Sequence, residues 1–154
     1  MSFFVLTGDP DEFQVDRCLL RALSREQAIQ WRVGRCREQI QKEDTVFLLR
    51  TAGGRYEEAL PGVIALATVV RVPEHEPCAQ PDLWRTPPRG PDWYALIELE
   101  EVRLSPEAGM VRREGFRKSP PLAKLGAFTE LRLSYEQADA MRVLWRRAAV
   151  AANM

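Results

Sequence analysis

The chain has 154 residues, of which 45% are hydrophobic, and its 22 basic and 22 acidic side chains cancel to a formal net charge of zero. A chain of this length can bury one core, so we expect a single domain over residues 1–154. Net neutrality argues against a protein that attracts polyanions through its overall field, and it predicts weak non-specific binding to nucleic acid.

The basic residues are concentrated in two segments. Residues 17–50 carry eight basic and four acidic side chains, and residues 112–147 carry nine basic and four acidic ones, whereas residues 71–110 carry four basic and eight acidic. If the two basic segments meet in the fold, a positive face can form on a neutral protein. The alternative is that these charges alternate over an ordinary solvated surface.

The predicted elements alternate between strands and helices. In chain order we predict a strand over residues 3–7, a helix in the second half of residues 11–23, a short helix from 24 to about 30, one or two helical turns over 36–41, strands over 45–51, 62–72 and 93–102, a short strand at Leu131 and Leu133, and a helix over 135–149. These elements indicate an α+β domain with a barrel-like sheet of about five strands, flanked by α-helices.

Two capping boxes set helix starts. Ser24 with Gln27 and Ser134 with Gln137 each pair a serine with a glutamine three residues later, which satisfies the first free amides of a helix. The short helix that begins at Ser24 would deliver Trp31 to a helix end, where the chain must turn.

The middle of the chain combines a buried strand with a long loop. Residues 62–72 are apolar at nearly every position, which predicts a strand covered on both faces. Prolines interrupt residues 73–91 without a sustained period, which predicts a long loop. Trp84 lies in this loop and is either an anchor that holds it or a surface for stacking.

The cysteines and the first residues indicate a cytoplasmic protein. Cys18, Cys36 and Cys78 are odd in number and share no Cys-x-x-Cys spacing, so we expect no disulfide framework and a reducing compartment. The apolar start ends at the turn of residues 8–10, which makes it too short for a signal peptide or a membrane span. We therefore expect no contact with a membrane.

Few residues have the spacing that catalysis or metal binding requires. His75 is the sole histidine, and it lies between prolines in the expected loop, where nothing orients its ring. Together with the three cysteines it does not provide the close ligand pairs of a zinc site. The sequence has no nucleophile elbow, phosphate-binding loop or dinucleotide fingerprint. We expect no catalytic residue, no metal and no cofactor.

Trp31 is the most informative residue, because Arg32, Gly34 and Arg35 follow it. An indole ring beside guanidinium groups, on a bend that glycine permits, suits stacking on a flat base while phosphate is neutralised. The alternative is a core tryptophan packed beneath the short helix.

Six segments carry a resemblance to a known family. They are Thr7–Pro10, Trp31–Arg35, Glu43–Leu48, Gly62–Val69, Pro91–Tyr94 and Leu131–Ser134. In this order they resemble the EVE domain, a branch of the PUA-like fold related to the YTH and ASCH domains, over nearly the whole chain. The resemblance implies a five-stranded, barrel-like sheet and a pocket for one modified base, such as methylated or hydroxymethylated cytosine or methylated adenine.

The resemblance also implies which residues bind. The base-binding pocket would be formed by Thr7, Asp9, Trp31, Val33, Gly34, Arg35, Arg50, Thr51 and Gly62. To these we add Trp84, as the candidate stacking surface in the loop. As part of our own mechanistic hypothesis, we expect Arg32, Arg35, Arg37 and Arg50 to hold phosphates. Glu43 stands where the family usually has glycine, and Gly34 and Arg35 stand where many relatives have Arg-Asn. These departures bear on which base is bound.

We therefore expect a non-catalytic module that binds DNA or RNA through a modified base, flipped out of a duplex or presented by a single strand. A nuclease or an RNA-processing protein would be its partner. Two alternatives stay open. One is a protein-interaction or scaffold domain with a vestigial pocket, and the other, less favoured, is a small nucleotide-processing enzyme that uses Asp9 or Glu98 as a base.

Overall fold

The computed structural model of the protein describes residues 1–123, 125 and 130–153. Lys124, part of the predicted basic segment, lies outside the described residues. In chain order the elements are β1 (Phe3–Gly8), α1 (Val15–Arg25), β2 (Ile29–Arg32), β3 (Thr45–Arg50), β4 (Gly62–Glu76), the 3₁₀ turn η1 (Pro81–Leu83), β5 (Asp92–Val102), the 3₁₀ turn η2 (Pro106–Ala108), β6 (Val111–Arg112), α2 (Arg113–Arg117), β7 (Leu131–Leu133) and α3 (Tyr135–Ala152).

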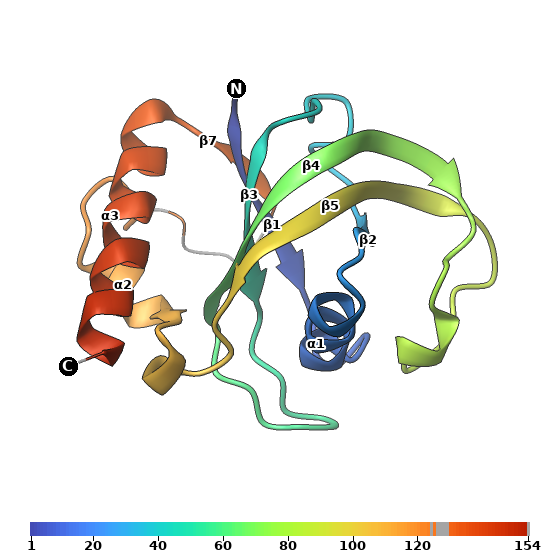
Figure 1. Ribbon diagram of the computed structural model, residues 1–154, viewed down its shortest axis with the longest axis horizontal. Coiled ribbons are helices and arrows are strands. Elements are labelled where there is room, and N and C mark those ends of the chain that lie inside the picture. The colour runs from blue at the N-terminus through green and yellow to red at the C-terminus, as the bar shows by residue number, and fades with distance from the viewer. Residues whose placement is uncertain (124, 126–129, 154) are drawn as a thin grey trace.

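One curled sheet organises the fold (Figure 1). In the described part of the chain it has seven strands in the order β2-β5-β4-β3-β1-β7, with β6 paired to the start of β4. Strand β1 runs parallel to β3, and the other pairs are antiparallel. The predicted α+β architecture with a barrel-like sheet is therefore confirmed, although the sheet has more strands than expected because β2 and β6 join it.

The long strands β4 and β5 arch together across the molecule (Figure 1). Their antiparallel register shifts between Leu66 and Ala67, between Val69 and Arg71, and between Arg71 and Glu74. Each shift leaves residues of one strand unmatched, which bends the pair and increases its twist. These bends explain why the sheet curls around α1 instead of remaining open and flat.

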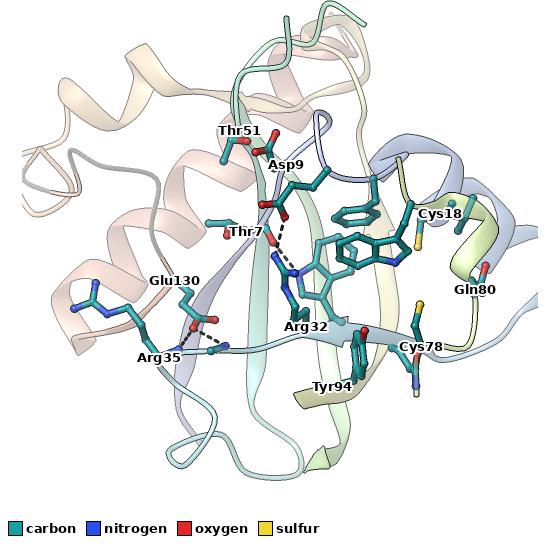
Figure 2. Close-up of a pocket in the computed structure, with 17 residues that line it drawn as sticks. Thr7, Asp9, Cys18, Arg32, Arg35, Thr51, Cys78, Gln80, Tyr94 and Glu130 are labelled. Carbon is teal, nitrogen blue, oxygen red and sulfur yellow. Dashed lines mark hydrogen bonds and ion pairs between the residues drawn. The ribbon is translucent and has the colours of Figure 1, made fainter. Parts of the chain in front are cut away.

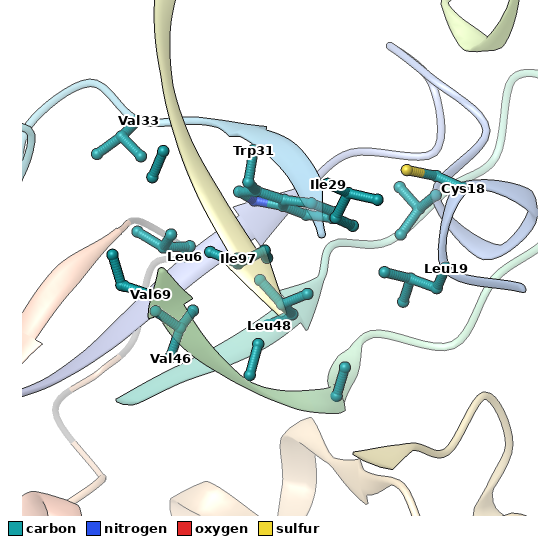
Figure 3. Close-up of a cluster of buried hydrophobic side chains, with 14 of the residues drawn as sticks. Leu6, Cys18, Leu19, Ile29, Trp31, Val33, Val46, Leu48, Val69 and Ile97 are labelled. Carbon is teal, nitrogen blue, oxygen red and sulfur yellow. The ribbon is translucent and has the colours of Figure 1, made fainter. Parts of the chain in front are cut away.

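Apolar layers cover both faces of the sheet. Inside the curl, Leu6 of β1 and Leu19 of α1 belong to one buried cluster (Figure 3). On the outer face, Met141 and Trp145 of α3 pack with Phe47 of β3 in a second cluster. Strand β4 contributes buried side chains to both clusters, which confirms the expectation that a nearly continuous apolar run is covered on both sides.

The last helix begins where the sequence indicates. Ser134 accepts a hydrogen bond from the Gln137 amide at 3.1 Å, and the Gln137 side chain accepts one from the Ser134 amide at 2.9 Å. This reciprocal pair is the predicted capping box. Of the helices in the described residues, none is long and apolar enough to cross a membrane.

The other predicted capping box is wrong. Ser24 lies inside α1, and Glu26 ends that helix in the left-handed region with φ at 50°. The segment Ile29–Arg32 is strand β2 rather than a helix, because it pairs antiparallel with β5. Tertiary pairing overrides the local helix signal here. Trp31 therefore lies on a strand, not at a helix end.

The predicted long loop begins later than expected. Strand β4 continues to Glu76 and pairs with the start of β5, so residues 73–76 belong to the sheet. Pro73 has no amide to donate, but it stands within the register shift between Arg71 and Glu74, where no paired amide is required. The proline signal was correct for a local irregularity and wrong for the end of the strand.

Candidate functional site

A cavity of about 430 Å³ opens beside α1, where the end of β1, strand β2 and the loop containing η1 meet. Small-molecule pockets usually measure roughly 300–1,000 Å³. Its lining is Thr7, Asp9, Glu12, Phe13, Cys18, Gln30, Trp31, Arg32, Gly34, Arg35, Thr51, Cys78, Gln80, Leu83, Trp84, Tyr94 and Glu130. Figure 2 shows these side chains gathered from segments that are far apart in the sequence.

Trp31 forms a buried part of the lining. The residue is 3% exposed, and its indole Nε1 donates a hydrogen bond to the Thr7 carbonyl at 3.1 Å. Gly8 lets the ring approach β1, because a Cβ at this position would lie 2.9 Å from the indole Cζ2. The interpretation of Trp31 as a core tryptophan is confirmed, although the residue also lines the cavity, and its role in stacking on a base stays a prediction.

Two further aromatic rings, those of Phe13 and Trp84, lie next to Trp31. Phe13 meets the Trp31 ring edge to face, with 5.5 Å between centroids, and stacks on Trp84 at 4.8 Å. A backbone bridge also joins Phe13 to Trp84. The half-buried Trp84 therefore fixes its loop against the body of the protein and at the same time presents an aromatic surface to the cavity.

A charged pair lies beside these rings. The Arg32 Nη2 is 2.7 Å from a carboxylate oxygen of Glu12, and the guanidinium carbon lies 5.1 Å from the centre of the Trp84 ring. Both charged side chains are nearly half exposed, so their pairing contributes at most about 1 kcal/mol. The pair can therefore open at low cost when another anion approaches Arg32.

Tyr94 lines the cavity and carries a buried hydroxyl without a hydrogen-bond partner. The residue is 2% exposed, and within the described residues its buried hydroxyl has no partner in hydrogen-bond geometry, although the weakly polar Cys78 thiol lies nearby. Burial first, and the nearby Cys78 second, raise the pKa of Tyr94 to about 12. Burial likewise raises the pKa of the Cys18 thiol to about 11. Both groups are protonated at neutral pH, which makes the phenol a hydrogen-bond donor and the thiol a poor nucleophile.

Glu130 closes one side of the cavity. Its Oε1 accepts hydrogen bonds from the amides of Gly34 at 2.7 Å, Cys36 at 3.4 Å and, between them, Arg35 (Figure 2). The turn that presents these amides is closed by a bond from the Arg37 amide to the Gly34 carbonyl, and bonds from the Gln39 and Ile40 amides to the Cys36 carbonyl close the next turn. The helical turns predicted for residues 36–41 are therefore hydrogen-bonded turns and not a helix.

The structure brings together most of the predicted pocket. Thr7, Asp9, Trp31, Gly34, Arg35, Thr51 and Trp84 line the cavity, and so does Arg32, which was expected to hold phosphate. Val33, Arg37, Arg50 and Gly62 do not line it. Val33 is buried in the inner core. Arg37 is exposed, with its guanidinium 4.9 Å from the centre of the Trp93 ring.

Arg50 is placed in the interior, which corrects both of its predicted roles. Its side chain is 4% exposed and pairs with Asp16 of α1 at 2.8 Å. The same guanidinium donates to the carbonyls of Leu60 and Leu104, each at 3.0 Å. An arginine with these internal partners has no donor left facing a phosphate, so its function is to tie α1 and two loops to the end of β3.

Gly62 is close to another backbone, but not to the cavity. A Cβ at Gly62 would lie 2.3 Å from the carbonyl oxygen of Val111, because β6 pairs with β4 at this point. The prediction of a close approach was correct in its geometry and wrong in its partner. The glycine permits strand pairing, and we assign it no ligand.

Several lining residues were missed from the sequence. Phe13, Tyr94 and Glu130 line the cavity but were not in the predicted pocket. Tyr94 had one usable signal, since it follows Trp93 in a segment that carried the resemblance, but strict alternation placed it on the same strand face as the exposed Glu98. Glu130 had no such signal, because it lies 96 residues from Gly34, the residue whose amide donates a hydrogen bond to it.

The other residues that were considered for catalysis or metal binding do not lie together in the structure. Glu98 is exposed on β5 and is not part of the lining, whereas Asp9 lines the cavity and accepts a hydrogen bond from the Asp11 amide at 2.9 Å. The His75 ring packs against Trp93 with 5.3 Å between centroids. In the described ranges of the chain, no group of three or more histidine, cysteine, aspartate or glutamate residues is placed to hold a metal ion.

Comparison with known proteins gives matches of structure and none of sequence. No family model matches the chain, and no curated protein matches it. A hypothetical protein from Leishmania major is 14% identical, with a TM-score of 0.64 and 96% of each chain covered. Human THYN1 in complex with DNA containing 5-methylcytosine is 13% identical, with a TM-score of 0.61 and coverage of 94% of this chain and 98% of that one.

A third match extends the comparison to RNA. The YTH domain of Zygosaccharomyces rouxii MRB1, in complex with N6-methyladenosine RNA, is 9% identical, with a TM-score of 0.51 and coverage of 96% of this chain and 84% of that one. At such identities the likeness establishes the fold alone. The protein has the PUA-like α+β fold that the sequence resemblance implied, and its structural neighbours include the DUF55 domain of human thymocyte nuclear protein 1.

Proposed function

We propose that the protein binds DNA or RNA through a single modified nucleobase, which the strand presents outside its stack and inserts into the cavity. The unpaired Tyr94 hydroxyl is the observation that carries this proposal. A buried polar group without a partner costs about 1–3 kcal/mol, so its presence among aromatic rings favours a ligand that completes its hydrogen bond. A flat ring with polar edges is such a ligand.

The structural neighbours support the same class of ligand. THYN1 was captured with DNA containing 5-methylcytosine, and the YTH domain was captured with N6-methyladenosine RNA. Both ligands carry a methylated base. On this chain, Arg32 and Arg35 are exposed beside the cavity, where they supply positive charge for the strand. The zero net charge keeps non-specific attraction low, so affinity depends mainly on the cavity.

The proposed mechanism assigns each group a different part of the base. Phe13 stacks on one face of Trp84, so the base stacks on the other face once Arg32, which lies over the ring, moves toward the strand. Tyr94 remains protonated because its pKa is about 12, and it donates a hydrogen bond to an acceptor on the base edge. No bond of the ligand is made or broken, so the protein acts as a reader of the strand.

A methyl group on the base is expected to strengthen binding only modestly. Burying one methyl is worth about 0.8 kcal/mol, which corresponds to roughly a fourfold change in Kd. Oligonucleotides with one 5-methylcytosine or one N6-methyladenine, each matched to its unmodified sequence, would be titrated at low and physiological salt while tryptophan fluorescence is followed. A flat titration with every oligonucleotide would contradict the proposal and favour the protein-interaction alternative.

Trp84→Ala is expected to weaken binding of the preferred oligonucleotide by roughly 5- to 150-fold, since stacking on an aromatic side chain contributes about 1–3 kcal/mol per base. Trp93→Ala is the matched control, because Trp93 is also half-buried but lies outside the lining. Isothermal titration calorimetry of both variants would measure the difference. Equal losses of affinity, or no loss in either, would remove Trp84 from the base-binding surface.

A further inference from the structure

The turn that follows β2 holds an anion supplied by the chain itself. The consecutive amides of Gly34, Arg35 and Cys36 all donate to one oxygen, Oε1 of Glu130. The next amide, that of Arg37, bonds back to the Gly34 carbonyl within the turn. The three amides before it are therefore directed outward as a group, and the Glu130 carboxylate neutralises their combined partial charge.

Converging backbone amides form an anion site that does not depend on a particular side chain. Successive amides of this kind make concavities that accept carboxylates and phosphates alike. Gly34 leaves room for the anion, because a Cβ there would lie 3.1 Å from the Glu130 Oε1. Figure 2 shows the Arg35 guanidinium extending away from the aromatic rings, so a second positive group stands on the outer side of the same turn.

This anion site opens into the cavity described above. Gly34, Arg35 and Glu130 all line it, together with Tyr94, whose buried hydroxyl is unpaired. One cavity therefore contains an unsatisfied polar group suited to a base edge and an anion site suited to the backbone of the same nucleotide. Within the described residues, the Arg35 guanidinium has no carboxylate partner, which leaves its charge available to an incoming anion.

We propose that the amides of Gly34, Arg35 and Cys36 form the phosphate subsite of the cavity, and that the Glu130 carboxylate occupies this subsite until a nucleotide phosphate displaces it. The inference rests on the proposed function, because it assigns the phosphate next to the inserted base. Displacement is required, since Oε1 uses all three amides and a second anion at the same place would be repelled. Glu130 therefore lowers the affinity for phosphorylated ligands and leaves the base contacts unchanged.

The first experiment tests the subsite without any base. Inorganic phosphate would be titrated into the full-length ¹⁵N-labelled protein, and the amide resonances of Gly34, Arg35 and Cys36 would be followed by NMR. Glu130→Gln keeps the shape of the side chain and removes its charge, so these three resonances should shift at roughly tenfold lower phosphate concentration than in the parent, the factor expected for one hydrogen bond to a charged group. Glu38→Gln is the matched control, because Glu38 is an exposed residue of the same turn.

The second experiment separates the subsite from the base pocket. 5-Methyl-2′-deoxycytidine and N6-methyladenosine would be titrated as nucleosides and as their 3′- and 5′-monophosphates into the parent, Glu130→Gln and Glu130→Ala. A gain for monophosphates alone supports the proposal. If nucleosides bind and neither variant gains affinity for monophosphates, the phosphate subsite is wrong while the proposed function stands.

Two further outcomes complete the test. If phosphate shifts the three amides but neither nucleosides nor oligonucleotides bind, the anion site stands and the base-binding function fails. If either Glu130 variant weakens nucleoside binding, Glu130 contacts the base itself and the displacement proposal is overturned. Glu130→Ala is included because the glutamine side chain of Glu130→Gln can still accept hydrogen bonds from the three amides. Thermal unfolding of each variant shows whether the compared proteins are folded.

Discussion

Replacing Trp31 with alanine is expected to lower the free energy of unfolding by about 3–5 kcal/mol, the usual cost of removing a large aromatic side chain from a core. The indole is 3% exposed, meets Phe13 edge to face and holds the Thr7 carbonyl through its Nε1. A typical domain has a total stability of about 5–15 kcal/mol, so this loss would leave the protein close to its unfolding threshold. Urea unfolding with a constant m-value measures the change.

The control for this prediction keeps an aromatic ring at position 31 and removes the hydrogen bond to the Thr7 carbonyl. Trp31→Phe retains most of the apolar volume but leaves the Thr7 carbonyl without the indole donor, so a smaller loss of about 1–3 kcal/mol is expected. A Trp31→Ala protein as stable as the parent would show that the ring is not part of the core. Because the alanine variant weakens the fold itself, Trp84 is the better probe of ligand stacking.

Arg50→Met is expected to lower the free energy of unfolding by about 3 kcal/mol, the lower end of the range for breaking a buried ion pair, because Asp16 is 39% exposed and water partly compensates it. The carbonyls of Leu60 and Leu104 also lose the donors that now satisfy them. Methionine fills much of the same volume without a charge. Chemical denaturation of the purified variant provides the measurement.

The contrast with an exposed arginine gives this prediction its control. Arg37→Met removes the same charge from the surface, where a change within about 0.5 kcal/mol is usual. The affinity of folded Arg50→Met protein for oligonucleotides should equal that of the parent, since Arg50 is outside the cavity. A specific loss of oligonucleotide affinity with unchanged stability would restore the phosphate-binding role first expected for Arg50.

The sequence was sufficient for most of the fold because its strongest signals are local or periodic. The apolar runs predicted β3 and residues 62–72 of β4, and the box formed by Ser134 and Gln137 placed the start of α3. The errors fall where long-range pairing decides. Ser24 and Gln27 have the pattern of a helix start, yet the residues after them pair with β5, and no local signal reports a partner that is more than sixty residues away.

The candidate site was less predictable than the fold, for a related reason. Trp31, Gly34 and Arg35 were found because they stand in one short segment with an unusual composition. Tyr94 was placed within a strand, but its unpaired hydroxyl depends on neighbours that no periodicity specifies. Arg50 was misassigned because an arginine at a strand end has the same appearance in the sequence whether it meets solvent or, as here, a carboxylate of a packed helix.

The order in which the strands are synthesised differs from the order in which they pair. Strand β1 lies between β3 and β7, and its antiparallel partner on one side, Leu131–Leu133, leaves the ribosome more than a hundred residues after β1 does. Throughout that interval one edge of β1 is bare, and bare strand edges recruit other chains. The nascent polypeptide therefore keeps one unpaired edge on β1 until β7 emerges.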